Sequence, residues 1–174
     1  DIQLSQQALA DASGAGGGGI HFVGRRVTLT NGSAALMQNA ASSAPGGEIT
    51  VNAKESLELI GTTPNATVRS SLNNESTGAG TGGAIRINPG RLAFMGGGQI
   101  VTRTYGTGAA GNITVNASDA IEVIGASPLN PRFFSSIFAI AQRTASGRAG
   151  DLSISTRRLT VLGGGIINAA SYGN

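Results

Sequence analysis

Acidic and histidine side chains are the first candidates for chemistry in this chain. Nine Asp and Glu residues and one histidine, His21, are scattered over 174 residues. Cleavage of a glycosidic bond needs two carboxyl groups at a defined separation, and the acids here do not fall together in that way. His21 alternates with Ile20 and Phe22, which is typical of a strand residue that faces solvent. We therefore expect no enzyme activity and no catalytic residue.

The residue types that hold cofactors and metals are also poorly represented. The chain has no cysteine, so it can form neither a disulfide nor a thiolate metal site. With a single histidine, a site built on two imidazoles is excluded. The glycine-rich stretch at 16–19 is not followed by the Gly-Lys-Ser/Thr of a phosphate-binding loop. We expect no cofactor and no metal.

Five charged residues of alternating sign form a sharper pattern, at intervals of 29, 36, 28 and 39 residues: Arg26, Glu55, Arg91, Asp119 and Arg158. Opposite charges on adjacent strands attract, whereas like charges repel. We interpret these residues as a structural charge ladder that sets the register of stacked strands, contributing at most about 1 kcal/mol per exposed pair. The alternative is a charged strip that binds a ligand.

The same intervals recur in the phrase Gly-x-[Ile/Leu]-x-[Ile/Val], which occupies residues 47–51, 83–87, 111–115 and 150–154, with a weaker copy at 18–22. Its apolar residues alternate with polar ones, as in a strand buried on one face. Repeats of about 20–50 residues are typical of stacked architectures, in which no unit can bury its apolar face alone.

Each repeat contains three short strand signals separated by glycine-rich turns. The first is the phrase itself, and the second is an apolar pair seven or eight residues later, such as Leu57 and Leu59. The third is placed near Ala35/Met37, Val68, Ile100/Thr102, Ile137/Ala139 and Ile167/Ala169. Three such strands per repeat predict one coil of a β-solenoid, in which Ile20, Ile49, Ile85, Ile113 and Leu152 form a buried column. We expect one segment over residues 1–174, of about five to six coils, taken from a longer repeat protein.

Two of the repeats are about ten residues longer than the others. The additional residues lie near 62–71 and 126–136, after the second strand of alternate coils, and each insertion has a proline at the same offset, Pro64 and Pro128. Insertions that recur at one corner project from one edge of a solenoid. Phe133 and Phe134 in the second insertion are a candidate contact patch. The alternative, which we favour, is that one ring packs beneath its own loop.

The overall composition bounds the partners. Lys and Arg exceed Asp and Glu by only three, no run of five basic residues occurs, and aromatic residues make up 4% of the chain. This pattern argues against nucleic acid as a partner. No apolar stretch approaches the roughly 20 residues of a membrane span.

Three phrases carry a family resemblance: Gly-Asn-Ile-Thr-Val-Asn-Ala at 111–117, Ala-Ile-Glu-Val-Ile-Gly at 120–125, and Ala-Gly-Asp-Leu-Ser-Ile-Ser-Thr-Arg-Arg-Leu-Thr-Val at 149–161. From about Gly16 onward the chain resembles the repeat region of large cyanobacterial exoproteins of the filamentous-haemagglutinin type. These are similar to two-partner secretion substrates, which an outer-membrane barrel exports as a long right-handed β-helix. Asn88-Pro89-Gly90 resembles a motif of the secretion domain, but we interpret it as a turn.

Together these features predict an all-β chain, a right-handed parallel β-helix, in a secreted or cell-surface protein. The expected function is a stalk or fibre segment for adhesion, aggregation or extracellular matrix. Its partners would be neighbouring coils or copies of itself, surface glycans or other cells, and the transporter during export. Two alternatives remain: a carbohydrate-binding or carbohydrate-active β-helix, which clustered outward aromatic residues or acids would favour and the sequence does not show, and a filament subunit that stacks end to end.

Overall fold

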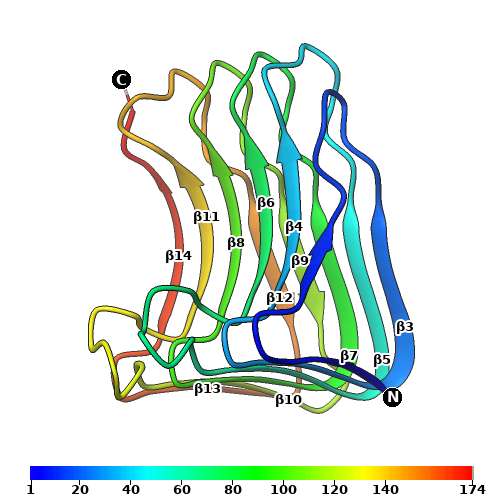
Figure 1. The fold of residues 1–174 in the computed structure, drawn as a ribbon, viewed down its shortest axis with the longest axis vertical. Helices are drawn as coiled ribbons and strands as arrows, with labels where there is room; N and C mark the ends of the chain where they lie inside the picture. Colours follow the sequence, from blue (N-terminus) through cyan, green and yellow to red (C-terminus); the bar gives the residue numbers. More distant parts are fainter. Residues whose placement is uncertain (174) are drawn as a thin grey trace.

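The computed structural model describes residues 1–173 as two sheets of parallel strands, with no helix among them (Figure 1). Sheet A contains β1 (Ile2–Leu4), β3 (Ile20–Thr30), β5 (Ile49–Ile60), β7 (Ile85–Met95), β9 (Ile113–Asn116), β10 (Ala120–Ile124), β12 (Leu152–Ser155) and β13 (Arg158–Leu162). Sheet B contains β2 (Leu9–Asp11), β4 (Ala34–Asn39), β6 (Ser71–Ser76), β8 (Gln99–Thr104), β11 (Ser136–Ala141) and β14 (Ile166–Ser171). None of the described residues forms a helix long and apolar enough to cross a membrane.

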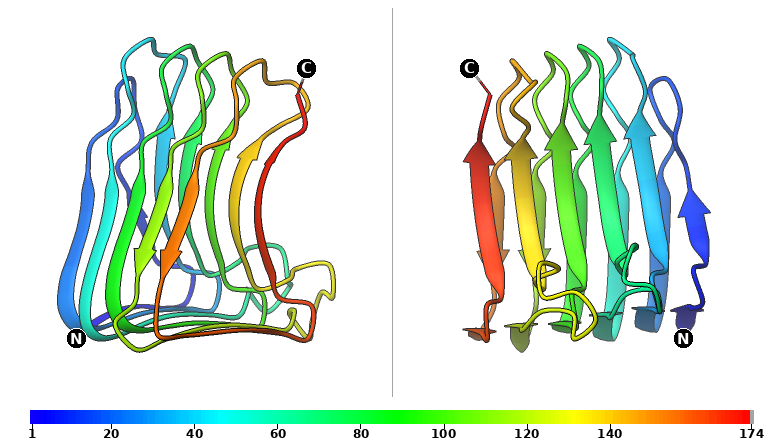
Figure 2. Two further views of the ribbon diagram at one scale, coloured as in Figure 1. Left: turned by 180° about the vertical axis from the view of Figure 1, so that it is seen from behind. Right: turned by 60° about the vertical axis from the view of Figure 1, so that its left-hand side comes forward.

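The chain alternates between the two sheets once in every repeat. Repeats 1 to 3 consist of β3 and β4, β5 and β6, and β7 and β8, while repeat 4 contains β9 to β11 and repeat 5 contains β12 to β14. Strands β1 and β2 precede repeat 1. Each strand pairs in parallel with its equivalent in the adjacent repeat, so the repeats lie side by side in chain order (Figures 1 and 2).

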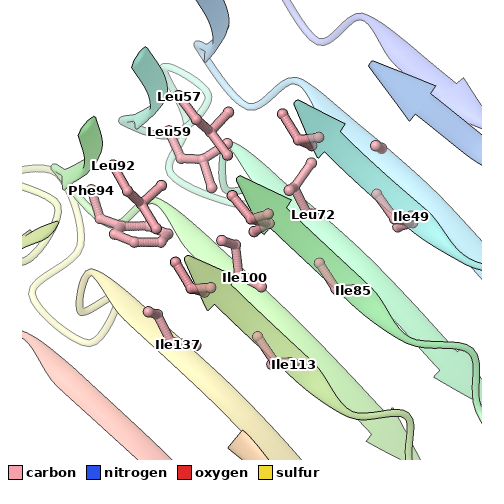
Figure 3. Packing of buried hydrophobic residues seen from close by; sticks show 14 of the residues in the cluster. Ile49, Leu57, Leu59, Leu72, Ile85, Leu92, Phe94, Ile100, Ile113 and Ile137 are labelled. Atoms are coloured by element: carbon pink, nitrogen blue, oxygen red, sulfur yellow. The ribbon is translucent and has the colours of Figure 1, made fainter. Parts of the chain in front are cut away.

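The predicted column at the start of each repeat is confirmed. Ile20, Ile49, Ile85, Ile113 and Leu152 occupy paired positions on successive strands. The three middle members are fully buried, and they face Leu57, Leu59, Leu92, Phe94, Leu72 and Ile100 across the interior (Figure 3). The hydrophobic core therefore lies between the sheets and runs continuously through all repeats.

The expected first and second strands are not separate in repeats 1 to 3. They run together as β3, β5 and β7, whereas β9 and β10, like β12 and β13, are separate. The register shifts between Gly24 and Arg26 and between Ala53 and Ser56, where extra residues let the long strands bend. Next to this bend, Asn88 Nδ2 donates to Asn52 Oδ1 at 2.9 Å and Asn116 Nδ2 donates to Asn88 Oδ1 at 3.2 Å. Asn88 and Pro89, interpreted above as a turn, lie within β7.

The third strand of repeat 2 was predicted wrongly at Val68. The strand is β6, in which Leu72 pairs with Ala35 and Ile100, and Asn74 pairs with Met37 and Thr102. Asn74 takes the inward position that Met37 fills in repeat 1 and Ala139 in repeat 4, and its amide donates to the carbonyl of Gly47 at 3.0 Å. Because the inward pair contains one polar residue, the apolar alternation that would mark this strand is missing.

The glycine of the recurring phrase has a structural cause. Gly47, Gly83, Gly111 and Gly150 stand at equivalent positions two residues before the buried column. A Cβ at Gly83 would overlap the carbonyl oxygen of Gly47, and the same holds for Gly111 against Gly83 and Gly150 against Gly111. The backbones of successive repeats approach each other too closely at this corner for any side chain.

The two insertions leave at the same corner, between sheet A and sheet B. They occupy residues 61–70 and 125–135, whereas repeats 1, 3 and 5 cross this corner with residues 31–33, 96–98 and 163–165. Each insertion closes with a single antiparallel bridge, Thr62 with Arg69 and Ala126 with Phe134. In the right-hand view of Figure 2 both loops project at the same end of sheet B.

Candidate functional site

The outer face of sheet B is the candidate functional site. Its strands alternate strictly, so in β11 the residues Ile137 and Ala139 enter the core while Phe138 and Ile140 point outward. Both outward side chains are partly exposed and line a groove of about 570 Å³ on this face. Sheet B supplies the floor of the groove and the two insertions supply one wall.

The wall of the groove joins the two insertions. Arg69 of the first insertion lies over the ring of Phe133 in the second, with Cζ 4.3 Å from the ring centroid. Its Nη1 and Nη2 donate to the carbonyl oxygens of Phe134 and Arg132, each at 3.3 Å. Thr62 and Ser127 add a buried hydroxyl–hydroxyl hydrogen bond of 3.3 Å. The two loops are therefore held against each other across the short turn of repeat 3.

The electrostatics of the groove are one-sided. Arg69 and Arg103 line it, and no Asp or Glu does. Burial lowers the pKa of Arg69, and the positive charge of Arg103 lowers that pKa further. Arg103 Nη1 lies 3.4 Å from Glu75 Oε1, but among residues 1–173 no carboxylate lies within ion-pair distance of Arg69. The groove thus presents an excess of positive charge.

Most of the aromatic residues belong to sheet B or to the segments next to its strands. Sheet B and its loops carry five of the seven aromatic side chains: Tyr105, Phe133, Phe134, Phe138 and Tyr172. Tyr105 and Tyr172 line a second cavity of about 530 Å³, which shares Gln142 with the groove. Phe133 and Phe138 line the groove, and Phe134 lines neither cavity.

The candidate contact pair is split by the structure. Phe133 is half-buried beneath Arg69, while Phe134 is 37% exposed, with its ring beside Gly164 of the next repeat. Each ring thus lies beside a residue from another repeat. A role for either in contacting a partner stays a prediction.

The predicted charge ladder is interrupted. Arg26 Nε and Glu55 Oε2 form an ion pair of 2.8 Å, but Arg91 pairs with Glu122 at 3.2 Å instead of with Glu55 or Asp119. No ion pair is found for Asp119 or Arg158 among the described residues. In the register of sheet A, Ser56 and Ala120, not Glu55 and Asp119, stand opposite the arginines at positions 26, 91 and 158.

Three residues of the predicted ladder, Arg26, Glu55 and Arg91, border a third cavity of about 410 Å³ on the outer side of sheet A. Unlike the groove on sheet B, its lining contains both signs of charge, Arg26 and Arg91 with Glu55, Glu58 and Glu122. The charges therefore compensate one another, so this cavity is better explained as an ion-pair surface than as a ligand site.

Replacing Arg91 by Glu should lower stability only modestly. The change removes the pair with Glu122 and places two acids together, but the Arg91 side chain is 54% exposed, so we expect a loss of about 1 kcal/mol or less. Thermal melting at low and high salt checks this, since screening should remove most of the difference. A loss that persists at high salt would contradict a surface ion pair.

The remaining candidates for chemistry stay apart. His21 is exposed on the outer side of β3, and residues 1–173 contain no group of three or more His, Asp or Glu side chains placed to hold a metal ion. Comparisons of the chain with protein-family models, with curated proteins and with solved structures find no match.

Proposed function

We propose that the chain is a segment of about five to six coils of a right-handed parallel β-helix, which serves as a rigid stalk or fibre segment of a secreted or surface-displayed exoprotein. In this proposal each repeat is one coil and the repeats stack into a rod. When two parallel strands of one sheet are connected through a second layer, the connection is right-handed in nearly all proteins. The family resemblance of residues 111–125 and 149–161 supports the extracellular location.

The exposed inner surface of repeat 5 carries the proposal. Leu159 and Val161 are 48% and 39% exposed, although their counterparts in repeat 4, Ile121 and Val123, are fully buried. Strands β12, β13 and β14 also have no strand on their far side among the described residues. An apolar layer flanked by unpaired parallel strands matches the surface that every inner repeat offers its neighbour. We infer that a further repeat of the same kind covers it.

A tandem fusion tests the rod. The fusion consists of residues 1–171 followed by residues 40–173. Ser171 and Asn39 occupy equivalent positions in sheet B, so the connection 40–48 leads into a second Ile49 beside repeat 5. A rod requires one cooperative melting transition, a higher Tm than the single segment, and an elongated particle extended by about 4.8 Å per added repeat. Two independent transitions with unchanged Tm would contradict the rod. An antibody against the 125–135 loop that detects the protein neither on intact cells of the source organism nor in their medium would contradict the extracellular location.

The same end surface also supports the alternative of a filament subunit. In that case the repeat that covers β12 to β14 comes from a second copy, and β1 and β2 form the opposite end. Sedimentation of the single segment over a concentration series separates the two functions. Concentration-dependent rods favour the filament, and a monomer at all concentrations favours the stalk.

A further inference from the structure

The groove and the second cavity together form one tract, defined here as the sheet B tract. Gln142 lines both cavities, which have volumes of about 570 and 530 Å³. Across the repeats, Tyr105, Gln142 and Tyr172 directly follow the paired residues Thr104, Ala141 and Ser171, so Gln142 lies between the two tyrosines. Equivalent residues on adjacent strands are about 4.8 Å apart. The tract is thus long and crosses several repeats, as an extended polymer would require.

The charge of the sheet B tract selects the class of ligand. Its lining contains Arg69, Arg103 and Arg143 and no carboxylate. Of these, only Arg103 has an acidic partner among the described residues. Arginine carries five N–H donors, and Arg69 donates through Nη1 and Nη2 to two backbone carbonyls only. The remaining N–H groups of a partly buried guanidinium can form charge-assisted hydrogen bonds with a carboxylate.

The uncharged lining of the tract suits sugar rings. Phe138 stands between Val101 and Asn168 on the neighbouring strands, and Phe133 and the two tyrosines offer further ring surface. Amide side chains of Asn73, Gln99 and Gln142 stand among them. A mostly apolar surface with a few polar groups that fix orientation is the usual composition of a ligand site. Amides can both donate to and accept from hydroxyl groups.

We propose that the sheet B tract binds an acidic polysaccharide, with uronate carboxylates on Arg69 and Arg143 and with sugar rings on Phe138 and the two tyrosines. The chain of the ligand runs obliquely over sheet B, from the insertions at the start of the strands to Tyr172 after the end of β14. This proposal does not depend on the stalk function, because it concerns one face of the segment whatever covers the segment's ends.

Titration calorimetry with an alginate oligomer tests the proposal, with a neutral mannan oligomer and poly-glutamate as references. Wild-type protein should bind alginate, with affinity falling as salt rises, and should bind mannan and poly-glutamate at least about tenfold more weakly. Arg69→Gln and Arg143→Gln should each weaken alginate binding by about tenfold. Arg158→Gln is the matched control, because it removes the same charge from the exposed residue on β13 and should leave affinity unchanged.

Arg143→Gln keeps the test decisive if Arg69→Gln disturbs the contact between the loops, because Arg143 is exposed and has no acidic partner among residues 1–173. Absence of alginate binding by the wild type would overturn the proposal. Equal affinity for mannan would show that the tract does not select the carboxylates of the ligand. Equal affinity for poly-glutamate would show that it does not select the sugar rings. Equal affinities of the Arg143→Gln and Arg158→Gln variants would show that the binding lies elsewhere.

Discussion

Replacing Ile113 by Asp is expected to unfold the segment or to bring it close to unfolding. Ile113 is fully buried between Ile85 and Leu152 in the column that runs through all repeats. An unpaired carboxylate there costs about 3–5 kcal/mol, a large part of the roughly 5–15 kcal/mol that stabilises a typical domain. Because each repeat is stable only against its neighbours, repeats 3 and 5 should loosen together with repeat 4.

Thr114→Asp is the matched control for this change. Thr114 is the adjacent residue of β9 and lies on the outer side, opposite Arg86 on β7. An acid there should change the free energy of unfolding by less than about 1 kcal/mol, which corresponds to a shift in Tm of about 2–4 °C. Thermal melting followed by circular dichroism measures both variants. A larger loss for Thr114→Asp than for Ile113→Asp would mean that the inner and outer faces of β9 are assigned the wrong way round.

Replacing Gly83 by Ala is expected to be nearly as damaging, although it adds a single methyl group. The added Cβ would overlap the carbonyl oxygen of Gly47 in the preceding repeat and lie 2.7 Å from Asn74 Nδ2. Overpacking with side-chain atoms costs about 1–3 kcal/mol. Here the opposing atom belongs to a backbone held in a parallel sheet, so we expect more than about 3 kcal/mol. Denaturant unfolding monitored by circular dichroism measures the loss.

Gly14→Ala provides the comparison for Gly83→Ala. A Cβ at Gly14 would meet no atom within 4 Å, and its φ does not lie in the left-handed region. That variant should unfold within about 0.5 kcal/mol of the wild type. If Gly83→Ala were equally harmless, the close approach of successive repeats at this corner would be disproved, and the glycine of the recurring phrase would need another explanation.

The parts of the fold that could be predicted are those encoded within single repeats. The phrase that contains Ile49, Ile85 and Ile113 marks its own strand by alternation, and its spacing gives the register of the column. The third strand of repeat 2 could not be predicted, because the buried Asn74 carries no apolar signal. The bend in β5 sets Ser56, and not Glu55, opposite Arg91, and an extra residue in a strand leaves no trace in residue types.

The candidate site could be predicted much less well than the core. Its wall depends on Arg69 meeting Phe133, residues 64 positions apart in loops with little sequence pattern. Its floor includes Phe138. In the sequence Phe138 is an ordinary outward strand residue, and only the pairing with Val101 and Asn168 of the neighbouring repeats makes it part of a continuous surface. The sequence predicts both loops as insertions at one corner. It does not predict that they touch, which is possible because repeat 3 lies between them and crosses the corner with the short turn 96–98.

The regular pairing of each repeat with the next also bears on how the chain acquires its structure. Strand partners are separated by 25 positions for Ile2 and Val27 and by 39 for Ile113 and Leu152, so all pairings span similar lengths of chain. Adding repeats therefore lengthens the protein without lengthening its loops, and relative contact order falls instead of rising. A chain of this kind can fold one repeat at a time, because each new repeat pairs with the repeat already folded before it. Each step then closes a loop of similar length, so the entropy cost of each step is similar.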